Sequence, residues 1–264
     1  MTPERISTCT YPLRERPAAE ALKVLADCGF GKVDLWGRPP HFSADPAECD
    51  HDALEAAAAA VGVTIANLGS YPGGEFASDS DEEVAAALDV MRATIDLAVR
   101  FGSRSIRVRP GTVEDPSIID RLVPPFQESA RYAEAQGIYL GMENHKGSLA
   151  GLPDACVDLC EKVGSKHFGI LYEPCNLLHG GVDYKAVFDR FAPWITHVHI
   201  KDGQVVDGKF ARTHLGEGEV DVAWVVASLE GIGYAGDYAL EYEICDVEPI
   251  ETGLPRWLAW FKEV

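Results

Sequence analysis

The fold class follows from the stretch Ile138-Tyr139-Leu140-Gly141-Met142-Glu143-Asn144-His145, an apolar run that ends abruptly in a carboxylate and an imidazole. A short apolar run that follows a glycine predicts a buried strand. Three later runs have the same form, and they end in Glu173, in the segment His197–Lys201 and in Glu241. Four strand ends that carry acids and histidines predict one shared cation site.

Outward from this stretch, the chain alternates short β-rich runs with longer amphipathic segments. The expected strands are residues 6–10, 33–36, 63–68, 105–109, 138–143, 168–173, 195–201 and 238–243. The expected helices are residues 17–28, 52–61, 80–101, 125–136, 153–163, 184–191, 221–229 and 254–262. This alternation predicts parallel strands covered by helices, and eight such units close into a (β/α)8 TIM barrel of the α/β class.

A doubly wound open sheet is the alternative fold. It usually has a glycine-rich phosphate loop after its first strand, and the residues at that place, Cys9-Thr10-Tyr11-Pro12, contain no glycine. No linker or shift in composition divides the chain. We therefore expect residues 1–264 to form a single TIM-barrel domain.

The composition argues against a nucleic-acid partner, a membrane partner and a cysteine-based framework. Lys and Arg total 23 and Asp and Glu total 42, which gives a formal net charge of −19, and such a field repels nucleic acid. The sequence has no bilayer-length apolar stretch and no signal-peptide pattern, so we expect a cytoplasmic protein with no membrane partner. The seven cysteines form no C-x-x-C pair, which argues against disulfide frameworks and zinc ribbons. Whether copies of the chain form a homo-oligomer is left open.

Four residues are candidate metal ligands, one on each of four consecutive predicted units: Glu143, Glu173, His199 and Glu241. In an α/β barrel the active site lies at the C-terminal ends of the strands, where charges at the ends of apolar runs need compensation. One divalent cation would supply it. The mostly oxygen donor set favours Mn²⁺ or Mg²⁺, and the imidazole also admits Co²⁺, Zn²⁺ or Fe²⁺. The alternative is that each acid is a solvated loop residue.

Further polar and aromatic residues near the predicted strand ends are candidate substrate contacts. Residues two apart on a strand point to the same side, so His145 shares the side of Glu143, and His197 and Lys201 share that of His199. Lys201, Arg107 and Arg109 are candidates to bind an oxyanion, with salt bridges to the surplus acids as the alternative. The remaining candidates are His214 and Glu217 in a glycine-containing loop, and Trp36 and Tyr71 as aromatic walls for a sugar face.

At these residues the sequence resembles the xylose-isomerase-like superfamily of TIM barrels, which contains sugar isomerases, ketose 3-epimerases, inosose-type dehydratases and apurinic endonucleases. The resemblance covers essentially the whole chain. It implies that Glu143, Glu173, His199 and Glu241 bind a single catalytic metal. In the epimerase branch, the residues matching Glu143 and Glu241 also exchange the substrate proton. The matching motifs are Glu143-Asn144-His145, Glu173-Pro174-Cys175-Asn176-Leu177-Leu178, His197-Val198-His199-Ile200-Lys201-Asp202, Gly216-Glu217-Gly218-Glu219-Val220-Asp221, and Gly233-Tyr234-x-Gly236 before Glu241.

The sequence departs from the family pattern at two positions. The family usually has Asp where this chain has Glu173, and epimerases and nucleases often have His where this chain has Asn176, which we keep as a substrate-binding candidate. The second departure favours the broader isomerase and dehydratase branches over a ketose 3-epimerase. An apurinic endonuclease fits poorly, because Arg212 stands where an acid is expected and Asn176 removes another zinc ligand.

The leading hypothesis is a metal-dependent isomerase or epimerase that acts on a small carbohydrate-like molecule: a sugar, a sugar phosphate or a polyol ketone. It would work by proton transfer through a metal-stabilised enediolate, with Glu143 and Glu241 as acid and base. The alternative enzyme is a metal-dependent dehydratase of the inosose or dehydroshikimate type, in which the same enediolate expels a β-hydroxyl. A hypothesis of another class is a non-catalytic barrel that binds a sugar.

Overall fold

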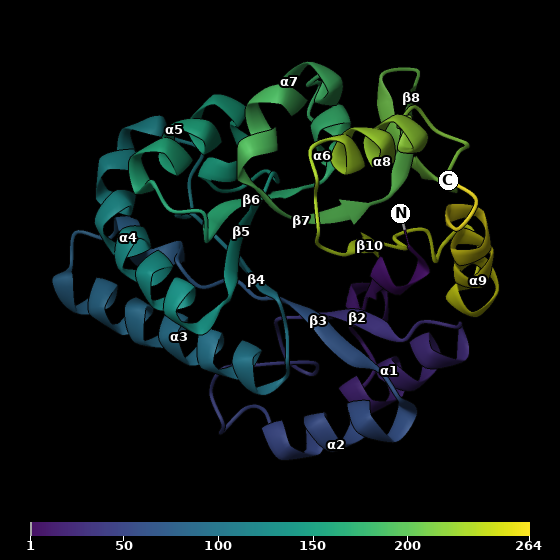
Figure 1. Cartoon of the computed structure of the whole chain (residues 1–264), viewed down its shortest axis with the longest axis horizontal. Coiled ribbons are helices and arrows are strands. Elements are labelled where there is room, and N and C mark those ends of the chain that lie inside the picture. The colour runs from purple at the N-terminus through teal and green to yellow at the C-terminus, as the bar shows by residue number, and fades with distance from the viewer. Residues whose placement is uncertain (1) are drawn as a thin grey trace. The chain divides into compact units, whose positions relative to one another are not determined.

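The computed structural model describes residues 2–264, and its strands and helices alternate along the chain as predicted (Figure 1). Eight parallel strands close into a barrel in the order β1-β10-β7-β6-β5-β4-β3-β2. This arrangement confirms the (β/α)8 TIM barrel. The barrel strands are β1 (Ile6–Cys9), β2 (Lys32–Trp36), β3 (Thr64–Gly69), β4 (Ser105–Val108), β5 (Tyr139–Glu143), β6 (Phe168–Tyr172), β7 (Ile195–Ile200) and β10 (Tyr238–Leu240).

Most helices begin and end within two residues of the predicted positions, and several have locally encoded caps; α4 begins at Ile119 rather than at residue 125, and α9 begins at Ile250 rather than at residue 254. Ser80 accepts a hydrogen bond from Glu83 N at 3.3 Å, and Asp221 accepts one from Trp224 N at 3.0 Å. Within residues 2–264, no helix combines the length and hydropathy needed to cross a membrane. The helices are α1 (Ala18–Asp27), α2 (His51–Val61), α3 (Asp81–Arg100), α4 (Ile119–Gln136), α5 (Pro153–Val163), α6 (Pro174–His179), α7 (Tyr184–Phe191), α8 (Val222–Gly231) and α9 (Ile250–Phe261).

The chain groups into two compact units. The first unit comprises residues 2–66, 173–184 and 198–264, and the second comprises residues 67–172 and 185–197. The expectation that residues 1–264 form one domain stays a prediction, and Met1 lies outside the described residues.

Strand register in the first unit places several polar side chains level with one another. Strand β1 pairs with β2 so that Cys9 lies opposite Asp34, and β10 pairs with β7 so that Ala239 lies opposite His199. Strand β1 also pairs with β10, Thr8 opposite Leu240. The chain of pairings β2-β1-β10-β7 therefore brings Asp34 and His199 into the same part of the barrel.

The core of the second unit contains packed aromatic rings and a glycine at a close backbone contact. The rings of Phe126 on α4 and Phe168 on β6 lie 4.7 Å apart between centroids, and both side chains are buried. Helices α3, α4 and α5 lie side by side (Figure 1). No larger residue can replace Gly169, because a Cβ at this position would come within 1.9 Å of the Trp194 carbonyl oxygen.

Elements in three further segments also differ from the prediction. Residues 202–213 form an antiparallel hairpin, β8 (Asp202–Val206) and β9 (Lys209–Thr213), with Asp207 and Gly208 at positive φ in its turn. An Asp-Gly pair between two short segments that contain β-prone residues is a known hairpin signal, and the prediction missed it. The last barrel strand ends at Leu240 rather than at residue 243. The short helix α6 follows Glu173 directly, in a segment for which no helix was predicted.

Candidate active site

The first unit holds three of the four predicted metal ligands: Glu173, His199 and Glu241. All three are almost completely buried, with relative exposures of 0%, 4% and 7%. His199 lies on β7, and Glu241 follows the last residue of β10. The Nδ1 atom of His199 lies 3.8 Å from Glu241 Oε2, which brings these two predicted ligands together.

Lys201 places its ammonium group among three carboxylates of the first unit. Its Nζ lies 2.6 Å from Glu241 Oε2, 3.0 Å from Glu243 Oε2 and 3.8 Å from Glu173 Oε2. Lys201 is only 4% exposed. Arg212 adds a second cation, with its Nε 2.8 Å from Glu243 Oε2. Lys201 thus makes ion pairs with acids, as the alternative interpretation had it, and its role toward an oxyanion stays a prediction.

Glu173 is held by the start of helix α6. Its carboxylate accepts hydrogen bonds from Cys175 N at 3.0 Å and from Asn176 N at 2.5 Å, so that it caps the helix. Asn176 therefore contributes its backbone N–H to the carboxylate, and the residue is half-buried. The cap fixes the orientation of Glu173, and its role as a metal ligand stays a prediction.

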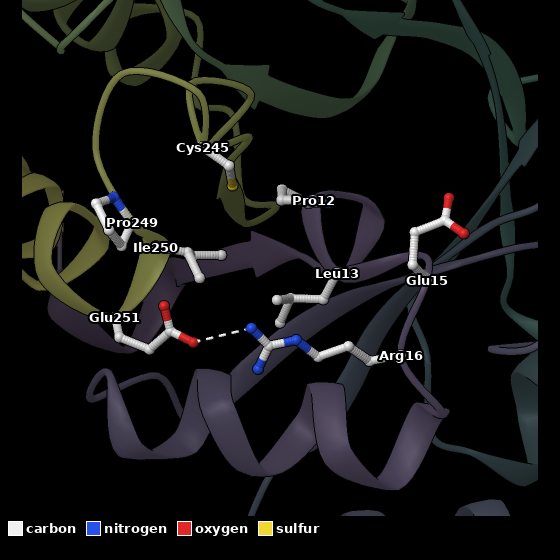
Figure 2. A pocket seen from close by; sticks show the side chains of 8 residues that line it. All are labelled: Pro12, Leu13, Glu15, Arg16, Cys245, Pro249, Ile250 and Glu251. Carbon is white, nitrogen blue, oxygen red and sulfur yellow. Dashed lines mark hydrogen bonds and ion pairs between the residues drawn. The ribbon is translucent and has the colours of Figure 1, made fainter.

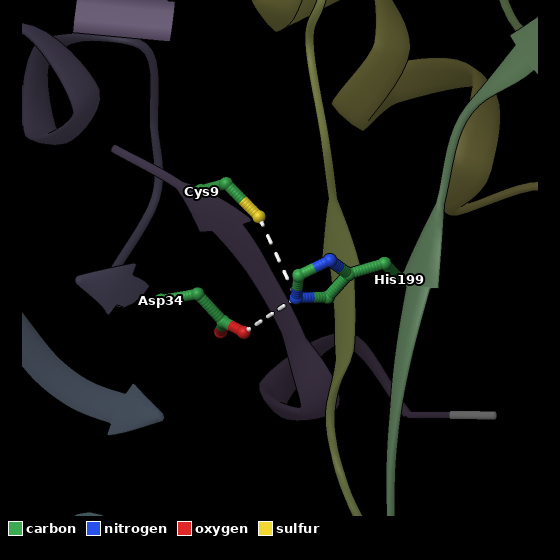
Figure 3. A group of neighbouring side chains, drawn as sticks. All are labelled: Cys9, Asp34 and His199. Atoms are coloured by element: carbon green, nitrogen blue, oxygen red, sulfur yellow. Dashed lines mark hydrogen bonds and ion pairs between the residues drawn. The ribbon is translucent and has the colours of Figure 1, made fainter. Parts of the chain in front are cut away.

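The other edge of the His199 ring faces residues for which no role was predicted. Its Nε2 atom lies 3.1 Å from Asp34 Oδ2 and 3.8 Å from Cys9 Sγ (Figure 3). Ser7 Oγ donates to Asp34 Oδ1 at 3.0 Å. Burial alone would lower the pKa of His199, but Cys9, Asp34 and Glu241 outweigh it and raise the pKa well above its usual value. The sequence signal that could have identified Asp34 as a site residue is its position as an acid inside the apolar run Val33-Asp34-Leu35.

In the second unit, Glu143 forms an ion pair with Arg107. The Arg107 Nη1 to Glu143 Oε2 distance is 2.5 Å, and the Glu143 side chain is 2% exposed. The guanidinium of Arg107 lies over the ring of Tyr71, 4.6 Å from its centroid. Tyr71, which was predicted to contact a sugar face, therefore packs on the arginine. Two other predicted substrate contacts also belong to the second unit. Arg109 donates a hydrogen bond to the Gly147 carbonyl at 2.7 Å, and His145 is exposed.

The remaining predicted substrate contacts occupy different surroundings. Trp36 is half-buried and packs edge-on against Tyr11, with centroids 5.9 Å apart. His214 accepts a hydrogen bond from Trp257 Nε1 at 3.0 Å, and Glu217 is exposed. His197, in the second unit, is buried. Their roles toward a substrate stay predictions.

Asp202 organises the loop that carries Glu217. Its buried carboxylate accepts four backbone N–H groups at 2.7 to 3.0 Å. Gly218 must be glycine, because a Cβ there would come within 2.2 Å of Asp202 Oδ1. A single carboxylate thus joins the β8–β9 hairpin to the loop. The donors are Gly203, Gly216, Gly218 and Val220.

Two cavities of the first unit lie beside the loops that follow β1 and β10. One, of ≈ 270 Å³, is crossed by the ion pair between Arg16 and Glu251 at 3.0 Å and contains none of the predicted site residues (Figure 2). The other, of ≈ 320 Å³, is lined by Glu243 and Arg212 together with Tyr11 and Tyr242. Because Glu243 contacts Lys201, the second cavity borders the ion-pair cluster.

The donor set of the first unit fits a divalent cation. A histidine nitrogen and a carboxylate oxygen each bind such ions at about 2.0–2.2 Å, so two ligands of one ion lie at most about 4.4 Å apart. The 3.8 Å between His199 Nδ1 and Glu241 Oε2 meets this limit. At the opposite edge of the ring, Cys9, Asp34 and His199 form a second group of potential metal ligands. The two groupings use different ring nitrogens.

Comparisons with known proteins place these residues in context. A family profile described as xylose isomerase-like TIM barrel matches residues 22–264. L-ribulose 3-epimerase of Mesorhizobium japonicum is 25% identical over 231 residues, which cover 83% of this chain and 75% of that protein. Inosose dehydratase of Geobacillus thermodenitrificans is 24% identical over 139 residues, 47% of each chain. An uncharacterized protein of Methanocaldococcus jannaschii is 25% identical over 165 residues, 58% of this chain and 56% of that protein.

The chain thus spans about half the length of two of these relatives. Among solved structures, a xylose isomerase-like TIM barrel protein of Mycobacterium smegmatis in complex with magnesium superposes with a TM-score of 0.79 at 18% identity. The superposition covers 98% of this chain and 97% of that one, which confirms the fold.

Proposed function

Because the chain belongs to the xylose isomerase-like TIM barrel family, we propose that it is a divalent-metal-dependent isomerase or epimerase of a small carbohydrate-like substrate. The observation that carries this proposal is the buried cluster on Glu241. His199 Nδ1 and Lys201 Nζ both contact Glu241 Oε2, at 3.8 and 2.6 Å. The carboxylate is thereby fixed, and its Oε1 can accept a proton without breaking either contact.

The proposed metal ligands are Glu143, Glu173, His199 and Glu241. Glu143 is included because it ends strand β5, and the C-terminal ends of barrel strands carry the active site in this fold. Mn²⁺ and Mg²⁺ suit the mostly oxygen donor set, and the structure from Mycobacterium smegmatis contains magnesium. When bound, such an ion polarises a substrate carbonyl and acidifies the neighbouring C–H bond.

Proton transfer is assigned to the two glutamates. Glu241 takes the proton from the carbon next to the carbonyl, and Glu143 returns one at the new position, or the two exchange these tasks. Each glutamate is oriented by a basic side chain of its own unit: Lys201 lies 2.6 Å from Glu241, and Arg107 lies 2.5 Å from Glu143. The matching arrangement supports a paired role.

The substrate would reach Glu241 through the cavity lined by Glu243. Tyr11 supplies an aromatic face there, and Arg212 supplies a charged hydrogen-bond donor, which together suit a polyhydroxylated molecule. The other proposed substrate contacts are His145, Lys201, Arg107, Arg109, Asn176, His197, His214, Glu217, Trp36 and Tyr71.

The proposal is tested by solvent deuterium exchange with the Mn²⁺-loaded enzyme and a panel of ketoses, ketose phosphates and inososes. Glu241→Gln keeps the shape of the side chain and removes its basicity, so exchange should fall by about 10²–10⁴-fold. Glu251→Gln is the matched control, because Glu251 pairs with Arg16 in the other cavity. Exchange at the wild-type rate in Glu241→Gln would exclude this glutamate from proton transfer.

A dehydratase is the second candidate, and the similarity to inosose dehydratase favours it. The same proton abstraction would be followed by loss of a β-hydroxyl as water. Mass spectrometry of the product separates the two reactions: an unchanged mass supports isomerisation, and a product lighter by one water supports dehydration.

A further inference from the structure

The ring of His199 lies between two carboxylates of the first unit. Asp34 Oδ2 lies 3.1 Å from Nε2 (Figure 3). On the other side of the ring, Glu241 Oε2 lies 3.8 Å from Nδ1. Asp34 is held in turn by Ser7, whose Oγ donates to Asp34 Oδ1 at 3.0 Å. Ser7, Asp34 and His199 are 0%, 2% and 4% exposed, so water does not compete for these hydrogen bonds.

The arrangement follows from strand register. Ser7 lies two residues before Cys9 on β1 and so points to the same side, and Cys9 lies opposite Asp34 on β2. Pairing of β1 with β10 and of β10 with β7 brings His199 to the same place. All of these contacts lie within the first unit.

Hydrogen-bond chemistry then fixes the tautomer of the ring. An ionised carboxylate only accepts hydrogen bonds, so the nitrogen beside Asp34 must carry a proton. With the proton on Nε2, the lone pair of the neutral ring lies on Nδ1, the nitrogen that faces Glu241. Metal-binding histidines commonly donate their other ring N–H to a carboxylate in this way.

We propose that Asp34, supported by Ser7, is a positioning residue that holds the Nε2–H of His199 and so presents Nδ1 to the divalent cation. Its effect on metal binding rests on the function proposed above, whereas the tautomer it imposes does not.

The first test is the affinity of metal-free protein for Mn²⁺, measured by calorimetric titration. Asp34→Ala removes the acceptor, and Asp34→Asn removes its charge while keeping its shape. Mutation of a residue that hydrogen-bonds a metal ligand typically weakens metal affinity by about 10–100-fold, and we expect both variants to weaken Mn²⁺ binding within this range. Asp237→Asn is the control, because Asp237 is a buried aspartate of the same unit that pairs with Lys32 at 2.8 Å. An unchanged affinity in folded Asp34→Ala would overturn the proposal.

The second test reads the ring nitrogens directly by ¹H–¹⁵N correlation in histidine-labelled protein, with His199→Asn to assign the signals. In Zn²⁺-loaded wild type we expect the proton on Nε2 and the metal on Nδ1, and in Asp34→Ala a loss of this preference. Zinc on Nε2 and Cys9 would overturn the proposal. If the wild type binds no metal, the proposed function fails, and the metal-free spectrum at alkaline pH still decides: a proton on Nε2 supports the role of Asp34, and a proton on Nδ1 overturns it.

Discussion

Replacing Lys201 by methionine removes the ammonium group from a buried cluster of acids and keeps much of the side-chain volume. Lys201 Nζ lies within 3.8 Å of carboxylate oxygens of Glu173, Glu241 and Glu243. In metal-free protein the substitution leaves these acids facing one another in a site that water hardly reaches. We therefore expect lower stability and, at the same time, tighter binding of a divalent cation.

The size of both effects can be estimated. Removing one partner of a buried ion pair costs about 3–5 kcal/mol. For a chain of 264 residues, an unfolding entropy of about 2.1 cal/mol/K per residue converts this into a fall in Tm of about 5–9 °C. Two unit charges about 5 Å apart in a medium of effective dielectric 20 interact by about 3 kcal/mol, and half of that is already tenfold in affinity. Lys201→Met should therefore bind Mn²⁺ at least about tenfold more tightly.

The assay combines thermal unfolding of metal-free protein with Mn²⁺ titration. Added Mn²⁺ at about 100 times its Kd should restore about 2.7 kcal/mol of stability. Lys162→Met is the matched control: Lys162 pairs with Asp120 at 3.0 Å on the surface, where such pairs contribute less than about 1 kcal/mol. Equal or weaker Mn²⁺ binding by Lys201→Met would refute the reasoning, because the ammonium would then not share carboxylates with the cation.

Three more predictions concern the same unit. Asp202→Asn offers one acceptor oxygen in place of two, so two of four backbone N–H groups lose their partner, and urea denaturation should show a loss of at least about 3 kcal/mol. Gly253→Ala should destabilise the protein by about 1–3 kcal/mol, because its Cβ would meet Tyr242 Oη at 1.8 Å; Gly231→Ala, with no atom within 4 Å, should not, and equal urea midpoints in the two variants would contradict this. The raised pKa of His199 means that its proton stabilises the metal-free fold below about pH 6.5 and that this stability is lost as pH rises through the higher folded value; the urea midpoint should therefore fall as the pH rises above about 6.5, and His199→Asn should flatten that trend.

The barrel was predictable because parallel strands buried on both faces are nearly continuous apolar runs. Leu140 and Met142 on β5 are both fully buried, and their run stands out in the sequence. The hairpin formed by residues 202–213 was missed because its strands are partly exposed and mixed in polarity. The end of the last barrel strand at Leu240 was also missed, since Glu241 and Tyr242 continue the sequence pattern.

The site was predictable only in part. His199, Lys201 and Glu241 are recognisable as polar residues at strand ends, and the structure brings them together in the first unit. Asp34 was not recognised as a partner of His199, because the two are 165 residues apart and meet only through the pairing of β2, β1, β10 and β7. The capping of α6 by Glu173 was also hidden, since glutamate is not a usual N-cap residue.

Anomalous diffraction from crystals of the Mn²⁺-loaded protein, recorded at the manganese absorption edge, tests the proposed metal site most directly. We predict one peak per chain within bonding distance of His199 Nδ1 and of carboxylate oxygens of Glu143, Glu173 and Glu241. The absence of a peak at these side chains, or a peak bonded to Nε2 of His199 beside Cys9, would contradict it.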